Sequence, residues 1–141
     1  MPCHLTRYHT RPGTSSPEAR GECILVVEDD ADVRTLSVAL LASLGYQVLE
    51  APDAAVAISV LKRERHIDLL LTDVILPNGV NGDAIARQAP LYHPNIKHMY
   101  MSGYTQDALV HQGRLDDGVI LLQKPFRKAD LAQKLRDAID G

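Results

Sequence analysis

Residues 67–73 read Ile-Asp-Leu-Leu-Leu-Thr-Asp, and this apolar stretch ending in an aspartate decides the expected fold. A short apolar run of this kind is typical of a strand that is buried on both faces of a sheet. We assign the strand to about 67–72, which places Asp73 at its carboxyl end. Four further runs of the same kind predict strands at about 23–27, 46–50, 96–101 and 118–122.

Helical patterns fill the intervals between these strands. We expect helices at 31–44, 54–65, 83–92, 105–112 and 128–140. Asp30 is suited to cap the first of them and Gly45 to end it. Spacings of three and four along this helix predict one apolar stripe, formed by Val33, Leu36, Leu40 and Leu44.

Strands that alternate with helices predict an α/β fold with a parallel sheet covered on both faces. Right-handed crossovers leave few topologies for such a chain. We expect a doubly wound, five-stranded sheet with the flavodoxin-like order 2-1-3-4-5 and five helices.

The bulk composition describes a soluble single domain. The chain has 141 residues, of which 45% are hydrophobic and 23% charged, and its formal net charge is -3. This balance excludes the basic excess of a nucleic-acid-binding protein. No apolar stretch approaches the roughly 20 residues that cross a membrane, and no signal peptide is recognisable. Two cysteines, Cys3 and Cys23, do not suggest a disulfide framework, so we expect a cytoplasmic protein.

Residues 1–21 differ from the remainder of the chain. They contain prolines, glycine and serines without apolar periodicity, which predicts a flexible tail or a linker. We therefore expect the folded domain to comprise residues 22–141.

Acidic side chains follow two of the predicted strands. Glu28 and Asp29 follow the first, and Asp73 follows the third. Because the carboxyl ends of parallel strands share one edge, these carboxylates should lie together there. Clustered carboxylates repel one another, and a hard cation with oxygen ligands would compensate them. Mg²⁺ fits this set best, whereas Asp30 is better suited to capping the helix.

Two further strands end in complementary groups. Ser102 would supply a hydroxyl after the fourth strand, and Lys124 an ammonium group after the fifth. Both groups can contact phosphoryl oxygens. Together these residues describe a phosphoryl-accepting site with Asp73 as the nucleophile, where Mg²⁺ and Lys124 neutralise charge.

These motifs resemble the receiver domain of bacterial two-component response regulators. The resemblance rests on ILVVEDDADVR (24–34), LLLTDVILP (69–77), MSGYT (101–105) and LLQKPF (121–126). It implies that Asp73 is phosphorylated by a histidine kinase or a histidine phosphotransfer protein. It also implies a metal site formed by Asp29, by Glu28 through water, by Asp73 and by the main-chain carbonyl of Ile75. Ser102 resembles the family's conserved switch hydroxyl and Lys124 its conserved lysine.

Three departures from the family pattern stand out. Glu28 replaces the commoner aspartate, and the loop 77–82 is one residue longer than usual. Leu121 stands where many receivers carry an aromatic residue, which puts the usual aromatic switch in doubt, although Tyr104 could substitute. The motif sequences look most like those of receivers attached to hybrid histidine kinases. The chain is therefore either a stand-alone receiver or a fragment of a hybrid kinase.

The resemblance implies partners as well as a site. The histidine donor would dock near the first helix, on apolar surface offered by Leu36, Val38 and Leu41. A homodimer through the face formed by 105–140 is a further expectation, whereas nucleic-acid and membrane partners are not expected. The chain would not be an enzyme in the ordinary sense, because it would catalyse only its own phosphorylation and dephosphorylation.

Three other functions compete with this interpretation. A hydrolase that forms an aspartyl phosphate usually carries a second aspartate two residues after the nucleophile, where this chain has Ile75. A cofactor-binding flavodoxin-like protein would need a glycine-rich phosphate loop after the first strand, where this chain has acids. A receiver-like interaction domain that works without phosphorylation is the main alternative.

Overall fold

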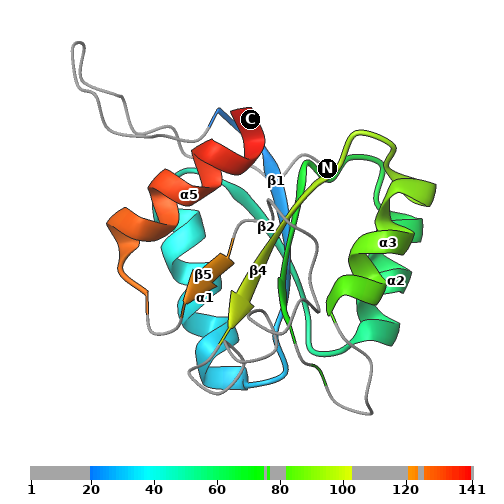
Figure 1. Cartoon of the computed structure of the whole chain (residues 1–141), viewed down its shortest axis with the longest axis horizontal. Helices are drawn as coiled ribbons and strands as arrows, with labels where there is room; N and C mark the ends of the chain where they lie inside the picture. The colour runs from blue at the N-terminus through cyan, green and yellow to red at the C-terminus, as the bar shows by residue number, and fades with distance from the viewer. Residues whose placement is uncertain (1–19, 75, 77–81, 103–120, 124–125, 141) are drawn as a thin grey trace.

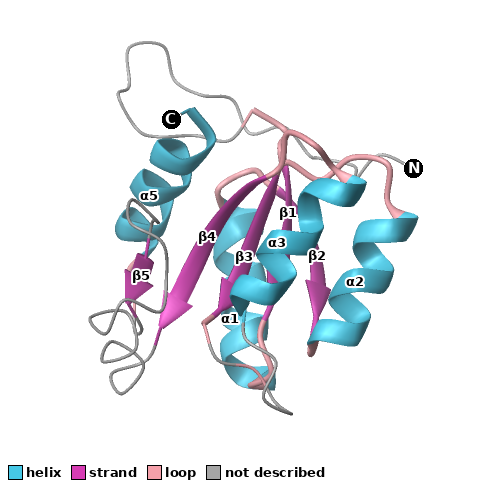
Figure 2. Ribbon diagram, turned by 45° about the vertical axis from the view of Figure 1, so that its right-hand side comes forward, coloured by secondary structure: helices cyan, strands magenta, loops and turns pink. Residues whose placement is uncertain are grey.

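The computed structural model describes residues 20–74, 76, 82–102, 121–123 and 126–140. Its five parallel strands form one sheet in the order β2-β1-β3-β4-β5 (Figure 2). They are β1 (Cys23–Val27), β2 (Gln47–Ala51), β3 (Leu69–Asp73), β4 (Lys97–Ser102) and β5 (Leu121–Gln123). The helices in this part of the chain are α1 (Ala31–Ser43), α2 (Ala54–Arg63), α3 (Gly82–Tyr92) and α5 (Lys128–Asp140).

The predicted parallel sheet and the order of its first four strands are confirmed. Asp73 is the last residue of β3 rather than the residue that follows it, because it still pairs with Met101 of β4. The predicted helix 105–112 lies outside the described residues, as does the first part of the last predicted strand.

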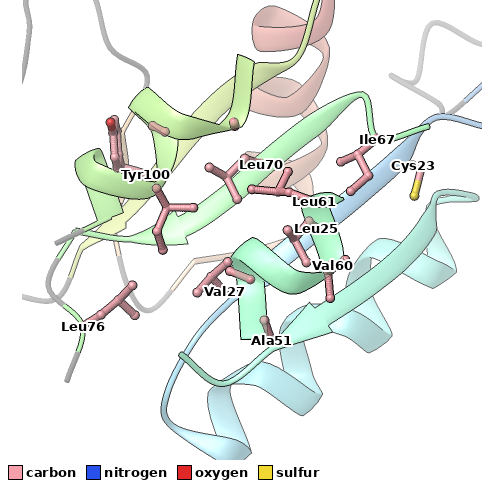
Figure 3. Packing of buried hydrophobic residues seen from close by; sticks show 14 of the residues in the cluster. Cys23, Leu25, Val27, Ala51, Val60, Leu61, Ile67, Leu70, Leu76 and Tyr100 are labelled. Atoms are coloured by element: carbon pink, nitrogen blue, oxygen red, sulfur yellow. The ribbon is translucent and has the colours of Figure 1, made fainter. Parts of the chain in front are cut away.

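The sheet separates two layers of helices. Helices α1 and α5 cover one face, and α2 and α3 cover the other (Figures 1 and 2). Alternation along β1 serves both layers, because Ile24 and Val26 pack in the core under α1 and α5. Leu25 and Val27 pack in the opposite core, under α2 and α3 (Figure 3). Every residue of β1 is buried, as expected for a central parallel strand.

Helix α1 begins at the predicted residue and ends at Ser43, one residue before the predicted end. The Asp30 carboxylate accepts hydrogen bonds from the main-chain N–H groups of Asp32 and Val33, and Gly45 has a φ of 97° after the helix. Of the predicted apolar stripe, Val33, Leu40 and Leu44 are partly buried, and the last two pack against the core. Leu36, however, is 57% exposed. Ser37 takes the buried position instead, because its hydroxyl donates to the Val33 carbonyl and is thus satisfied inside the core.

Within the described residues, no helix combines the length and the apolar character needed to cross a membrane.

Candidate metal centre

Three carboxylates meet at the carboxyl edge of the sheet. Glu28 and Asp29 follow β1, and Asp73 ends the neighbouring strand β3. One oxygen from each of the three lies within 4.8 Å of the others. Glu28 and Asp73 are only 1% and 2% exposed, whereas Asp29 is open to solvent. The expected juxtaposition of these acids is therefore present in the structure.

The turn between β1 and α1 positions the first two acids. The main-chain N–H of Glu28 donates to the Ala51 carbonyl of β2 over 3.1 Å, which extends the sheet by one residue. The Glu28 carboxylate in turn accepts a hydrogen bond from the main-chain N–H of Asp30 over 3.1 Å. Asp30 itself caps α1, so it is used as a structural residue while Glu28 and Asp29 remain in the cluster.

The close approach of α3 fixes the main chain at Asp73. The N–H of Gly82 donates to the Val74 carbonyl over 2.8 Å. A Cβ atom at Gly82 would lie 2.0 Å from the main-chain oxygen of Asp73 and 2.9 Å from Cγ2 of Thr72. The Thr72 hydroxyl also donates to that same Asp73 oxygen, over 3.0 Å. Only glycine therefore permits this packing of α3 against the end of β3.

The donor set fits a hard divalent cation. The three side chains offer only carboxylate oxygens, and Mg²⁺ prefers oxygen ligands. Mg²⁺ usually binds a protein through one or two carboxylates and keeps several waters. The exposure of Asp29 leaves the cluster accessible from solvent, as such a hydrated ion requires. The same cation would offset the repulsion among three like charges, two of which are buried.

The remaining predicted site residues are described less fully. Ser102 is the last residue of β4 and pairs with Gln123 of β5, so its main chain lies at the same edge as Asp73. Ile75 and Lys124 lie outside the described residues, and so does Tyr104. The structure thus brings Glu28, Asp29 and Asp73 together, and the roles assigned to the other residues stay predictions.

Two residues at this edge were not predicted from the sequence. Gly82 appeared only as the end of a loop, and its close approach to the main chain of Asp73 was not predicted. Arg34 contacts the turn that holds Glu28, through a hydrogen bond to its main-chain oxygen. No spacing in the sequence indicates this hydrogen bond between Arg34 and Glu28, because it depends on how α1 packs against the strands.

Comparison with known proteins places this geometry in a family. Residues 24–136 match the model of the response regulator receiver domain. The sensor kinase CckA of Brucella abortus (strain 2308) is 31% identical over 118 residues, which are 83% of this chain and 12% of that kinase. The response regulator receiver protein CpdR of the same organism is 34% identical over 112 residues, which are 79% of this chain and 92% of CpdR.

Among solved structures, the receiver domain of the sensor histidine kinase PA1611 from Pseudomonas aeruginosa PAO1 superposes with a TM-score of 0.71. It is 27% identical, and the match covers 86% of this chain and 99% of that domain. That structure holds a magnesium ion coordinated in its active-site cleft. The family model covers most of this chain, and the chain belongs to the response regulator receiver domain family of two-component signalling.

Proposed function

We propose that Asp73 accepts a phosphoryl group from a phosphohistidine and that Glu28 and Asp29 hold the Mg²⁺ ion required for this transfer. The observation that carries the proposal is the cluster of Glu28, Asp29 and Asp73 at the end of two adjacent strands. Mg²⁺, when bound, supplies positive charge that offsets the charge of the transferring group. The carbonyl of Ile75 is proposed as a further ligand.

The transfer itself needs little from the protein beyond position and charge. A carboxylate oxygen of Asp73 forms a bond to phosphorus while the bond from phosphorus to the donor's imidazole nitrogen breaks. The electron pair of that bond returns to the imidazole, and an aspartyl phosphate results. Lys124 is proposed to pair with a phosphoryl oxygen and Ser102 to donate its hydroxyl to another.

Phosphorylation would act as a switch through charge. The phosphoryl group adds roughly −1.5 to −2 charge at pH 7. We propose that Ser102 and Lys124 reorganise around it and that the segment from Ser102 through 105–112 changes its average position. The complete architecture would then have five strands and five helices, within a domain at 22–141 that follows a tail or linker at 1–21.

The partner would be a histidine kinase or a histidine phosphotransfer protein. The proposed docking surface on α1 needs a correction, because Leu41 is fully buried and cannot contact a partner. Leu36 is exposed and Val38 is half-buried, so these two residues support the proposal. A homodimer through 105–140 and a cytoplasmic location remain parts of the proposal, without nucleic-acid or membrane partners.

The activity of a longer protein also enters only as a proposal. The chain corresponds to 12% of the sensor kinase CckA and to nearly all of CpdR. It could therefore serve as the receiver of a hybrid kinase or as a stand-alone receiver. Either way, the proposed chemistry is that of a phosphoacceptor in signalling rather than of an enzyme that turns over a separate substrate.

Mass spectrometry of the intact protein tests the proposal. We expect incubation with acetyl phosphate and Mg²⁺ to add the mass of one phosphoryl group, and we expect chelation of Mg²⁺ to prevent it. The Asp73→Asn variant should gain no mass. Asp68→Asn is the matched control, because Asp68 precedes the same strand at the opposite edge of the sheet.

Asp68→Asn should be phosphorylated like the wild type. A folded wild-type protein that is phosphorylated neither by acetyl phosphate nor by a cognate histidine donor would contradict the proposal. That result would favour the alternative of an interaction domain that works without phosphorylation.

A further inference from the structure

Arg34 on α1 joins the ends of two strands beside the acidic cluster. Its Nη1 donates to the main-chain oxygen of Glu28 over 2.8 Å. Its Nε donates to the Glu50 carboxylate of β2 over 3.1 Å. The Arg34 side chain is 19% exposed and the contact with the Glu28 oxygen is partly buried, whereas Glu50 is 53% exposed and its ion pair lies at the surface. The guanidinium group therefore connects α1, the end of β1 and the end of β2.

The carbonyl group that Arg34 binds is in a special position. The β1–β3 pairing ends at Val27 and Thr72, so the Glu28 carbonyl comes just beyond that ladder. Glu28 is almost fully buried, and a buried carbonyl requires a hydrogen-bond donor. Arg34 provides this donor in a charge-assisted hydrogen bond, which is stronger than a neutral one.

That carbonyl also belongs to the peptide unit between the two proposed metal ligands. The unit from Cα of Glu28 to Cα of Asp29 is planar, so holding its oxygen fixes the orientation of the whole unit. The orientation of this plane decides how the Glu28 and Asp29 side chains leave the main chain. A group that holds the plane therefore sets the relative positions of both carboxylates.

We propose that Arg34 is a positioning residue for the metal site, which it orders through the Glu28–Asp29 peptide unit. This inference rests on the proposed function, since it assumes that Glu28 and Asp29 hold Mg²⁺. Arg34 does not touch the ion. Glu50 orients the guanidinium group and offsets part of its positive charge.

The effect of removing Arg34 has a diagnostic sign. A cation near the site repels Mg²⁺, so a role through charge alone predicts that Arg34→Ala binds Mg²⁺ more tightly. A positioning role predicts weaker binding. Residues that orient metal ligands typically contribute about 10-fold to 100-fold in affinity. We expect a loss of about tenfold, at the lower end of this range, because Arg34 acts through the main chain.

The test is a titration with Mg²⁺ alone. Binding is monitored by NMR, through the amide resonances of Asp29 and Asp30, and by calorimetry. The variants are Arg34→Ala and Arg34→Lys, with Arg63→Ala as the control. Arg63 is an exposed arginine in an ion pair with Glu64 at the end of α2, so its removal changes the net charge equally. Lysine keeps the charge of Arg34 but lacks the fork that reaches two acceptors.

We expect Arg34→Ala to weaken Mg²⁺ binding about tenfold, Arg34→Lys to lie between it and the wild type, and Arg63→Ala to match the wild type. Unchanged or tighter binding by Arg34→Ala would overturn the inference. If Arg34→Ala does not fold, Arg34→Lys decides, and wild-type affinity in that variant would overturn the inference. A wild type that binds no Mg²⁺ would instead contradict the proposed function.

Discussion

The two edges of the sheet carry ionisable groups in opposite arrangements. At the amino edge, Arg136 of α5 donates to Glu22, which precedes β1, over 2.7 Å. It also donates to Asp140 over 2.8 Å and contacts the Tyr46 hydroxyl at 3.5 Å. At the carboxyl edge, Glu28, Asp29 and Asp73 gather three charges of one sign. Among the described residues, opposite charges thus pair at the amino edge, and three carboxylates lie together at the carboxyl edge.

The pKa values at the amino edge show how complete this pairing is. Burial alone would lower the pKa of Arg136, but hydrogen bonds with Tyr46, Glu22 and Asp140 outweigh it and raise that pKa. Burial tends to raise the pKa of Glu22, yet hydrogen bonds from the Arg20 main chain and from Arg136 lower it overall. Both groups therefore keep their charges in the folded protein, and their interaction stabilises the position of α5.

The contrast separates a structural charge cluster from one that depends on a ligand. At the amino edge, Arg136 is paired with other side chains of the protein. The carboxyl edge brings three carboxylates together, two of them buried, so a bound cation should stabilise the protein. Neutralising a charged side chain should consequently destabilise the protein at the amino edge and stabilise it at the carboxyl edge.

The largest effect is expected for Arg136→Ala. The substitution leaves Glu22 and the buried Tyr46 without their cation. Breaking a fully buried ion pair typically costs about 3–5 kcal/mol, and because this pair is only partly buried we expect a loss at or below the lower end of that range. Urea unfolding measures the loss, with Arg87→Ala as the control, because Arg87 forms an exposed i,i+4 pair with Asp83 that should contribute less than about 1 kcal/mol. Equal losses for the two variants would contradict a stabilising role of the Arg136 ion pair at the amino edge.

Gly82→Ala should have the next largest effect. The new Cβ would lie 2.0 Å from the Asp73 oxygen, and overpacking of this kind costs about 1–3 kcal/mol. Because the strain falls on the main chain of Asp73, we also expect slower phosphorylation by acetyl phosphate. Adding Thr72→Ser should restore only part of the stability, since it removes the contact with Cγ2 but not that with the oxygen. Wild-type stability and rate in Gly82→Ala would contradict this packing.

Asp73→Asn should stabilise the protein in the absence of Mg²⁺. It removes one of three like charges, and we expect a gain of about 1 kcal/mol in the free energy of unfolding. Asp68→Asn should instead destabilise, because that carboxylate accepts the Cys23 N–H over 2.8 Å and pairs with His66. Urea unfolding with and without Mg²⁺ measures both effects, and Mg²⁺ should stabilise the wild type more than Asp73→Asn. A destabilised Asp73→Asn would contradict the proposed repulsion.

The smallest effect is expected for Glu22→Gln, whose effect on stability should depend on pH in the acidic range. Because the pKa of Glu22 is lowered in the folded state, its contribution to stability is present above the ordinary value of 4.5 and is lost as pH falls through the lowered value. Glu22→Gln should therefore be less stable than the wild type at neutral pH, and the difference should close below pH 4.5. Urea unfolding between neutral and acidic pH measures it. A difference that widens in acid would contradict the assignment.

The sequence predicted the helices and strands of the described residues, and the acidic cluster, because both depend on local patterns. Apolar runs fixed the strands, Asp30 marked the helix start, and acids at strand ends predicted the meeting of Glu28, Asp29 and Asp73. One position of the predicted stripe on α1 was wrong, because hydrophobicity alone favoured Leu36, whereas the buried Ser37 satisfies its hydroxyl within its own helix.

Contacts between distant residues could not be predicted in this way. Arg136 and Glu22 are 114 positions apart, and Arg34 and Glu50 are 16 apart. No spacing rule connects such pairs, because only the packing of a helix against the sheet brings them together. The same holds for Gly82, whose role follows from the distance between α3 and the end of β3.

Locating the phosphoryl group within the chain tests the central proposal most directly. Borohydride reduces an aspartyl phosphate to homoserine, so treatment of the phosphorylated protein followed by peptide mass spectrometry marks the residue that was modified. We expect homoserine at position 73 alone, and only when the protein was phosphorylated in the presence of Mg²⁺. A mark at Asp29 or at another carboxylate, with Asp73 unchanged, would contradict the assignment of Asp73 as the phosphoacceptor.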